Sequence, residues 1–375
     1  MQIYIHIPFC LSKCKYCAFN SIVANYDLIE DYIKALCSEI GRTRLNQEIS
    51  TIYIGGGTPS ILTIEQFNKI FDVLNRVFNL DRCNEITIEA NPGTNLTYSY
   101  LNELQRIGIN RLSLGVQSFD DETLKIIGRV HNSNEAIEAI ILAKSIFSNV
   151  SIDLMYDLPN QTLNILHETL TTALNLNVQH ISIYGLEIEE GTEFDRLNGL
   201  GQLNLPDDDE SAEMYAFITS ELPKHGYHRY EISNFSKKGF ESKHNIGYWS
   251  DVEYVGFGVS AHSYLHDMRY SNIANVKEYI DKINANLEVK QIEEVVTKKR
   301  AMEEFCFLSL RKAEGIDTKK FQIKFGESIE NIYNNSIKKL TKQGLIVVDS
   351  EHIKLTERGM KYGNLAFAEF LLIDD

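Results

Sequence analysis

Short apolar runs alternate with amphipathic stretches along the first two hundred residues of the chain. The runs are rich in β-branched and aromatic residues, as buried strands are, and they occupy residues 2–7, 51–54, 85–89, 111–116, 150–155 and 180–184. Between them, the segment YDLIEDYIKALCSEI places Leu28, Tyr32, Leu36 and Ile40 on one side of a helix. Six strand–helix alternations predict an α/β fold with a mostly parallel sheet covered by helices. Six units are fewer than the eight of a closed barrel, so we expect an open, partial parallel β/α barrel.

The pattern changes after about residue 290. The segment TKKRAMEEFCFLSLRKAEGI and the one that begins ESIENIYNNSIKKL predict helices, and two short strands are expected around Asp349 and Ser350. Helices followed by a small β-wing resemble a winged helix, which we interpret as a packing domain without a nucleic-acid role. We therefore divide the chain into a core at residues 1–205, an extension of that core at 206–290 and a smaller, mainly helical domain at 291–375.

The composition is that of an ordinary globular protein, with 43% hydrophobic and 24% charged residues among 375. A formal net charge of −15 argues against a nucleic-acid partner, because a duplex binder needs a basic surface. The chain shows no charged-then-apolar leader, and its apolar runs are too short to span a bilayer. We therefore expect a cytoplasmic protein whose thiols are reduced.

Three of the six cysteines lie within eight residues, as Cys10-x-x-x-Cys14-x-x-Cys17, directly after the first predicted strand. A structural zinc site normally needs four ligands and a disulfide framework needs pairs, so neither fits three clustered thiols. Burial as small hydrophobic side chains is a poor alternative, because Ser12 and Lys13 make the loop polar. Three thiolates at this spacing suit a 4Fe–4S cluster that keeps one iron open, at the sheet edge where α/β proteins bind ligands.

Polar residues or glycines follow the apolar part of several predicted strands. The glycine triplet of YIGGGTPS allows close backbone approach to a ligand, although a triplet alone usually marks only a turn. The other strands or their following turns carry Glu89 in IEANP, Gln117 in LSLGVQSF, Arg129 in IGRVH and Asp153 in SIDLMYDLP. A lone Glu at a strand end is normally a solvated loop residue, but four polar residues along one rim predict a ligand site.

The cysteine spacing, followed at one remove by an aromatic residue, resembles the signature of radical S-adenosylmethionine proteins. In that superfamily the open iron binds the amino and carboxylate groups of S-adenosylmethionine, which the reduced cluster cleaves to a 5′-deoxyadenosyl radical. The chain as a whole resembles the coproporphyrinogen oxidase-like branch. This resemblance implies Cys10, Cys14 and Cys17 as ligands of a 4Fe–4S cluster. It also implies S-adenosylmethionine contacts at Tyr4, Gly56, Gly57, Thr58, Glu89, Gln117, Arg129, Asp153 and Gly185.

The branch divides into two groups, and two sequence features separate them. The oxygen-independent coproporphyrinogen III dehydrogenases typically have a fourth cysteine two residues after the third, where this chain has Phe19. The heme chaperones carry a His-Asn-x-x-Tyr-Trp motif, which is present here as His244, Asn245, Tyr248 and Trp249. Both features favour a heme chaperone, and radical decarboxylation of coproporphyrinogen III is the alternative.

The resemblance to heme chaperones implies heme as a third bound group. Histidine is a common axial ligand of heme iron, so His244 is a candidate, and Tyr248 and Trp249 offer flat apolar surface to a porphyrin. From chemistry alone His244 is more often a hydrogen-bonded histidine, and His262 and His266 are nearby competitors. The implied partners are acceptor hemoproteins, those of the respiratory chain above all, so that delivery takes place at the membrane periphery.

One turn departs from the pattern of the branch. After the fifth strand the branch usually has Gly-Leu-Pro-Gly, whereas this chain has Asp157-Leu158-Pro159-Asn160. Asp and Asn tolerate left-handed backbone better than most residues, so we expect the turn to survive. A more open or differently charged rim is the alternative.

Overall fold

A single twelve-stranded sheet dominates the computed structural model, which describes residues 1–372. The six strands expected from the sequence are adjacent and parallel to one another, in chain order. They are β1 (Gln2–Ile7), β4 (Thr51–Gly56), β5 (Glu85–Ala90), β6 (Arg111–Gln117), β7 (Val150–Tyr156) and β8 (His180–Gly185). In residues 1–372 the two edge strands of the sheet do not pair, so the predicted open, partial barrel is confirmed.

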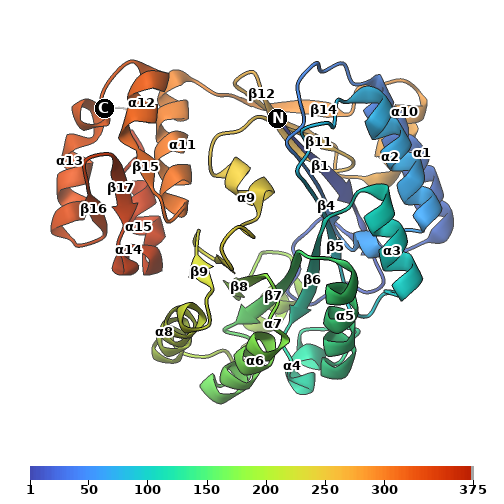
Figure 1. Cartoon of the computed structure of the whole chain (residues 1–375), viewed down its shortest axis with the longest axis horizontal. Coiled ribbons are helices and arrows are strands. Elements are labelled where there is room, and N and C mark those ends of the chain that lie inside the picture. The colour runs from blue at the N-terminus through green and yellow to red at the C-terminus, as the bar shows by residue number, and fades with distance from the viewer. Residues whose placement is uncertain (373–375) are drawn as a thin grey trace.

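Helices cover the outer face of this sheet (Figure 1). They are α1 (Tyr26–Arg42), α2 (Ile64–Val77), α3 (Tyr98–Ile107), α4 (Asp121–Ile126), α5 (Ser133–Ile146) and α6 (Leu163–Leu176). Local sequence fixes where they begin: Thr63 and Gln66 form a capping box at the start of α2, as Asn132 and Glu135 do for α5. The predicted stripe of α1 packs inward, since Tyr32, Leu36 and Ile40 are fully buried.

The strands alternate between an apolar and a polar face. Ile88, Leu112, Leu114, Ile152 and Leu154 belong to the large hydrophobic core between sheet and helices. The intervening residues point the other way, because side chains alternate along a strand. As a result the inside of the partial barrel is lined by hydroxyls and carboxyls rather than by the aliphatic layers usual in closed barrels.

Residues after the sixth strand extend both edges of the sheet. On one side, α7 (Glu193–Gly199) and α8 (Asp208–Lys224) precede β9 (His228–Arg229) and β10 (Asn234–Ser236), which join β8 in antiparallel fashion. The short helix α9 (Lys243–Tyr248) then carries the chain to the other edge, where β11 (Tyr254–Phe257) runs parallel to β1. There β12 (His262–Leu265), β13 (Met268–Asn272), α10 (Val276–Asn284) and β14 (Lys290–Val295) complete the sheet and its cover.

The C-terminal part has its own hydrophobic core, built around side chains such as Leu310, Phe321, Tyr333 and Ile353. Its elements are α11 (Lys298–Arg311), β15 (Ile316–Asp317), α12 (Thr318–Phe325), α13 (Ile329–Lys342), β16 (Ile346–Val348), β17 (His352–Leu355), α14 (Glu357–Lys361) and α15 (Gly363–Ala368). The order helix–strand–helix–helix–strand–strand, with β17 between β15 and β16, has the winged-helix arrangement predicted from the sequence.

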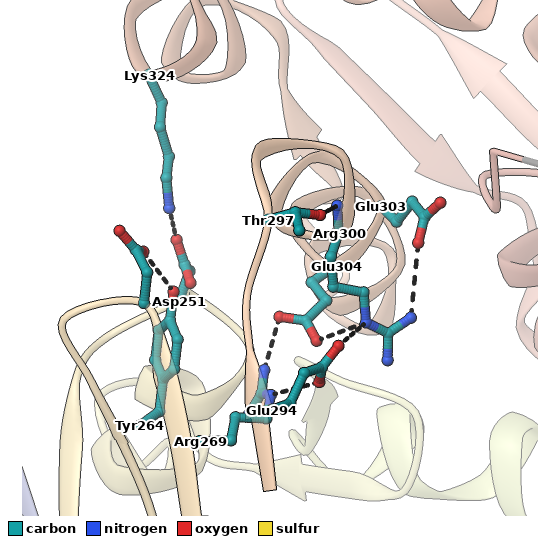
Figure 2. Close-up of polar contacts among 10 residues, drawn as sticks. Asp251, Tyr264, Arg269, Glu294, Thr297, Arg300, Glu303, Glu304 and Lys324 are labelled. Atoms are coloured by element: carbon teal, nitrogen blue, oxygen red, sulfur yellow. Dashed lines mark hydrogen bonds and ion pairs between the residues drawn. The ribbon is translucent and has the colours of Figure 1, made fainter. Parts of the chain in front are cut away.

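An ion-pair network joins this C-terminal part to the sheet (Figure 2). Arg269 of β13 donates from Nη2 to Oε2 of Glu304 on α11 at 2.6 Å. Arg300 lies within 3.2 Å of the other Glu304 oxygen, and Lys324 of α12 pairs with Asp251 beyond α9. Because Glu304 is buried, its pairing with Arg269 fixes how α11 docks on the edge of the sheet.

No helix within residues 1–372 combines the length and apolar character that crossing a membrane requires.

Candidate functional site

A cavity of about 1470 Å³ opens at the carboxyl ends of the parallel strands, facing the C-terminal part. Its walls include most of the residues predicted for the site, namely Cys10, Cys14, Cys17, Gly56, Gly57, Thr58, Glu89, Gln117, Arg129, Asp153, Gly185, Tyr248 and Trp249. The sequence had not indicated the opposite wall, which is formed by Arg311 at the end of α11 and by residues 360–365 and Phe367. We call this space the main cavity.

The three clustered cysteines sit on a loop that other segments hold in place. The Lys15 amide donates to the Ile127 carbonyl at 3.1 Å, and the Lys15 carbonyl accepts from the Phe194 amide at 2.9 Å. Cys10, Cys14 and Cys17 are free, half-buried thiols that all face the main cavity. Accessible thiols on a braced loop fit the ligand set of a 4Fe–4S cluster with one open iron.

Two donors approach the sulfur atoms of this loop. Arg129 Nη1 lies 3.5 Å from Cys14 Sγ, and the Thr58 hydroxyl lies 3.6 Å from Cys10 Sγ. Hydrogen bonds to the sulfur ligands set the reduction potential of a cluster, so Arg129 and Thr58 are placed to tune one.

Within residues 1–372, no three His, Cys, Asp or Glu side chains converge on a point where one metal ion would be held. A cubane cluster does not require that, because each thiolate binds a different iron.

Asn91 connects the cluster loop to the strand ends, and sequence reasoning had missed it. Its Nδ2 donates to the Thr58 hydroxyl at 2.7 Å, while its Oδ1 accepts from Arg129 Nη2 at 2.5 Å. Arg129 also donates to the Gly115 carbonyl. One amide thus holds both donors that approach the thiols. Its position two residues after Glu89, in the turn that ends β5, was the available signal.

The glycine turn after β4 is built around Glu89. Gly56 has φ of +116°, and a Cβ there would lie 2.7 Å from the His6 ring. Its amide donates to Glu89 Oε2 at 3.1 Å, while the Tyr53 hydroxyl donates to Oε1 at 2.7 Å. A Cβ on Gly57 would lie 2.6 Å from the Phe9 carbonyl oxygen. Glycine is therefore required at both positions by the backbone itself.

Burial raises the pKa of Glu89 to about 7, against the hydrogen bonds from Tyr53 and Gly56, which lower it. Burial also raises the pKa of Asp153, whose carboxylate accepts from the Ser113 hydroxyl at 3.4 Å. Arg111, fully buried at the start of β6, opposes the rise for both carboxyls. These acids are poised to ionise when a cation or a hydrogen-bond donor arrives.

Tyr4 and His244 lie outside the lining of the main cavity. The Tyr4 hydroxyl is 3.0 Å from His6 Nδ1, and Tyr4 lines a second cavity that adjoins the first. Tyr4 also stacks on Tyr53, which does line the main cavity, so the expected contact of Tyr4 with S-adenosylmethionine stays a prediction.

Burial and hydrogen bonding argue against the predicted binding of heme iron by His244. His244 is 1% exposed, its Nδ1 lies 2.8 Å from the Thr51 hydroxyl, and its Nε2 lies 3.0 Å from the Tyr248 hydroxyl. Burial lowers its pKa to about 3, so the ring is neutral. Both ring nitrogens are occupied, and His244 positions Tyr248 rather than presenting itself to a ligand.

The turn after β7 keeps its shape without glycines. Asp157 and Asn160 both adopt φ of +61°, the left-handed conformation that was expected to be tolerated. Asn160 is held by Asn204, and Asp157 Oδ2 accepts from the Ser211 hydroxyl at 2.8 Å. Asp157 also lines the main cavity, so the turn survives and adds a carboxyl to the rim.

Comparisons with known proteins agree with this arrangement. The radical SAM superfamily model matches residues 4–173, and the HemN C-terminal domain model matches residues 296–362. The chain is 42% identical over 374 residues to the heme chaperone HemW of Bacillus subtilis (strain 168), covering 98% of each chain. It is 40% identical to the heme chaperone HemW of Lactococcus lactis subsp. lactis (strain IL1403), covering 99% of this chain and 97% of that one.

A solved structure of coproporphyrinogen III oxidase (HemN) from Escherichia coli has the same fold, with a TM-score of 0.86 at 23% identity, over 99% of this chain and 89% of that one. Membership of the radical SAM superfamily implies a 4Fe–4S cluster and S-adenosylmethionine, which the cysteine loop and the rim of the main cavity fit. With likeness at this level along the whole chain, the protein belongs to the HemW family within the radical SAM superfamily.

Proposed function

We propose that this protein is a heme chaperone, which binds heme and delivers it to apoproteins. The observation that carries the proposal is the likeness to proteins named heme chaperone HemW, at 40–42% identity over nearly the full length of both chains. Likeness of that extent covers the cysteine loop, the motif of α9 and the C-terminal part together. A shared radical SAM core alone would leave the activity open.

The surroundings of the cysteine loop support the proposal against the alternative, decarboxylation of coproporphyrinogen III. Phe19 stands where the dehydrogenases have their extra cysteine, and its side chain is 70% exposed at the edge of the main cavity. Tyr248 and Trp249 line the same cavity from α9. An exposed ring and two further aromatic side chains beside the loop suit contact with a flat, apolar macrocycle.

In the proposed cofactor site, separate residues hold the cluster and bind S-adenosylmethionine. Cys10, Cys14 and Cys17 would hold the cluster, and the Glu89 carboxylate would accept a hydrogen bond from the amino group of S-adenosylmethionine. When bound, the cluster and S-adenosylmethionine supply one-electron chemistry. Asp153 would accept hydrogen bonds from a ligand hydroxyl, so Asp153→Ala should weaken S-adenosylmethionine binding, measured by calorimetry on cluster-loaded protein.

We further propose a cytoplasmic location and, as acceptors, hemoproteins of the respiratory chain. Delivery to an acceptor in the membrane requires only that this protein dock at the membrane surface. A supporting result would be heme transfer to an apocytochrome embedded in vesicles.

The function is tested by following heme itself. The anaerobically reconstituted protein is titrated with heme, freed of excess by gel filtration and mixed with an apo b-type cytochrome. We expect a shifted Soret band on titration and its conversion to the cytochrome spectrum on mixing. A protein that binds no heme, or that never releases it to any acceptor, would refute the chaperone function.

A further inference from the structure

A second cavity of about 560 Å³ adjoins the main cavity at the C-terminal end of α9, within the size range of small-molecule sites. Its floor continues the inner face of the sheet beyond β1. Tyr254 faces Tyr264 across β11 and β12, and Tyr264 faces Arg269 across β12 and β13. Leu308 of α11 contributes from the C-terminal part, on the side where Glu304 pairs with Arg269. Figure 2 shows the polar contacts that dock that part beside Tyr264 and Arg269, two residues of the cavity lining.

The two cavities share one wall. Ala18, Phe19, Tyr248 and Trp249 line both of them. Asn20, which follows Phe19, lines the second cavity. Its Nδ2 donates hydrogen bonds to the Ser260 hydroxyl and to the Ala274 carbonyl, and these hold it in place. A flat ligand in the second cavity would therefore lie against the cysteine loop, separated from the main cavity by aromatic side chains.

Histidines are absent from the described lining of the main cavity, whereas two line the second one. His6 is engaged at both nitrogens, by the Tyr4 hydroxyl and by the Asn20 carbonyl at 2.8 Å. His262, at the start of β12, is exposed and has no hydrogen bond or ion pair within residues 1–372. It is the one cavity-lining imidazole in that range whose nitrogens are both available.

We propose that the second cavity seats the heme, with the His262 imidazole as its axial ligand and Tyr254, Tyr264 and Trp249 around the porphyrin. This assignment rests on the proposed chaperone function and states where the protein binds the heme that it carries. The chemistry fits, because a neutral imidazole is a common axial ligand and aromatic rings cover a porphyrin face. The Tyr264 hydroxyl already donates a hydrogen bond to Asp267, and burial raises its pKa to about 12. Tyr264 therefore competes poorly with His262 as a ligand of the heme iron.

The assignment separates the roles within the motif of α9. His244 holds Tyr248 by the hydrogen bond to its hydroxyl, and Tyr248 and Trp249 form the wall that heme contacts. His244 is thus a positioning residue, and its replacement should act through loss of local stability. His262 is placed to touch the iron directly.

Three histidine variants test this on the full chain loaded with heme. His262→Ala should shift the Soret band, weaken heme binding at least tenfold, and regain the parent spectrum when imidazole is added. His266→Ala is the matched control, because His266 follows in the same hairpin but lines neither cavity, and it should bind heme like the parent. His244→Ala should lower the unfolding midpoint but leave an imidazole-ligated spectrum.

A fourth variant tests the cavity without touching a histidine. Leu308 lines only the second cavity, so Leu308→Trp should block heme while S-adenosylmethionine binding, measured by calorimetry, stays unchanged. If the parent protein binds no heme, the chaperone function falls and this inference with it. If the parent binds heme and both His262→Ala and Leu308→Trp bind it with unaltered spectrum and affinity, the function stands and the second cavity is not the heme site.

Discussion

Arg311, at the end of α11, lies over the indole ring of Trp249, with its guanidinium carbon 4.4 Å from the ring centroid. Trp249 caps the C-terminus of α9, so this contact joins the C-terminal part to the wall between the two cavities. Burial lowers the pKa of Arg311, with Glu231 acting in the opposite sense. A partly desolvated cation over an indole is a favourable arrangement.

Removing the cation should loosen this junction. Arg311→Met keeps the apolar stem and should lower the free energy of unfolding by about 1 kcal/mol, the usual size of a cation–π contact. Trp249 is the sole tryptophan, so its fluorescence reports the change directly. The free energy of unfolding of Arg311→Lys, which keeps a cation, should lie between those of Arg311→Met and the parent. Equal stability and identical emission of Arg311→Met and the parent would show that the contact contributes nothing.

The cluster assignment predicts that replacing a cysteine of the loop removes the cluster, whereas replacing a cysteine elsewhere does not. Cys14→Ala should abolish the broad visible absorption of the reconstituted protein and its content of about four irons per chain. Cys37→Ala is a suitable control, because Cys37 is a half-buried thiol on α1 away from both cavities. Retention of the full chromophore by Cys14→Ala would mean that this thiol is not a ligand.

Binding of S-adenosylmethionine should depend on pH through Glu89. Because the pKa of the empty site is about 7, the carboxyl is protonated at pH 6 and ionised at pH 8. The amine N–H groups of the bound ligand donate more strongly to a carboxylate than to a neutral carboxyl, so affinity should rise about tenfold from pH 6 to pH 8. The matched variant is Glu89→Gln, in which this pH dependence should vanish. The same slope in Glu89→Gln would assign it to another group.

The same carboxyl affects stability in a defined direction. Its pKa in the folded protein lies above the ordinary value of 4.5, so the folded state binds the proton more tightly than the unfolded state. Glu89 therefore contributes stability that is complete below about pH 4.5 and is lost as the pH rises to about 7.

Gly56 and Gly239 give a matched pair for the backbone argument. Both have positive φ, so an alanine is strained at either position. A Cβ at Gly239 meets nothing within 4 Å, whereas one at Gly56 lies 2.7 Å from the His6 ring. Gly56→Ala should therefore destabilise the protein by more than Gly239→Ala, by about 1–3 kcal/mol, in denaturant unfolding. Equal losses would show that His6 moves aside without cost.

The sequence was sufficient to predict the parallel core, because its signals are local. Each strand carries its own apolar run, and Glu89 and Gln117 lie at strand ends, where parallel topology brings them to one edge. Asp153 instead lies in the middle of β7 and lines the main cavity from within the sheet, which corrects its expected place at a strand end. The left-handed turn at Asp157 and Asn160 was equally a local property.

Features that depend on distant segments were not predictable in this way. The two ring nitrogens of His244 are hydrogen-bonded to Thr51, 193 residues away, and to Tyr248. No local sequence pattern predicts the contact with Thr51. Likewise β11 joins β1 after some 250 intervening residues, and Arg311 reaches Trp249 from another hydrophobic core. The lining of the second cavity likewise comes from segments far apart in the sequence, from Tyr4 to Leu308.

The central claim, that heme is carried rather than made, is tested most directly by offering the same reconstituted protein heme and coproporphyrinogen III side by side. Both reactions are run anaerobically with reductant and S-adenosylmethionine, and products are separated by chromatography. We predict a stable heme complex that passes its heme to an apocytochrome, and no protoporphyrinogen above the level of the Cys14→Ala variant. Repeated turnover of coproporphyrinogen III without transferable heme would contradict the account.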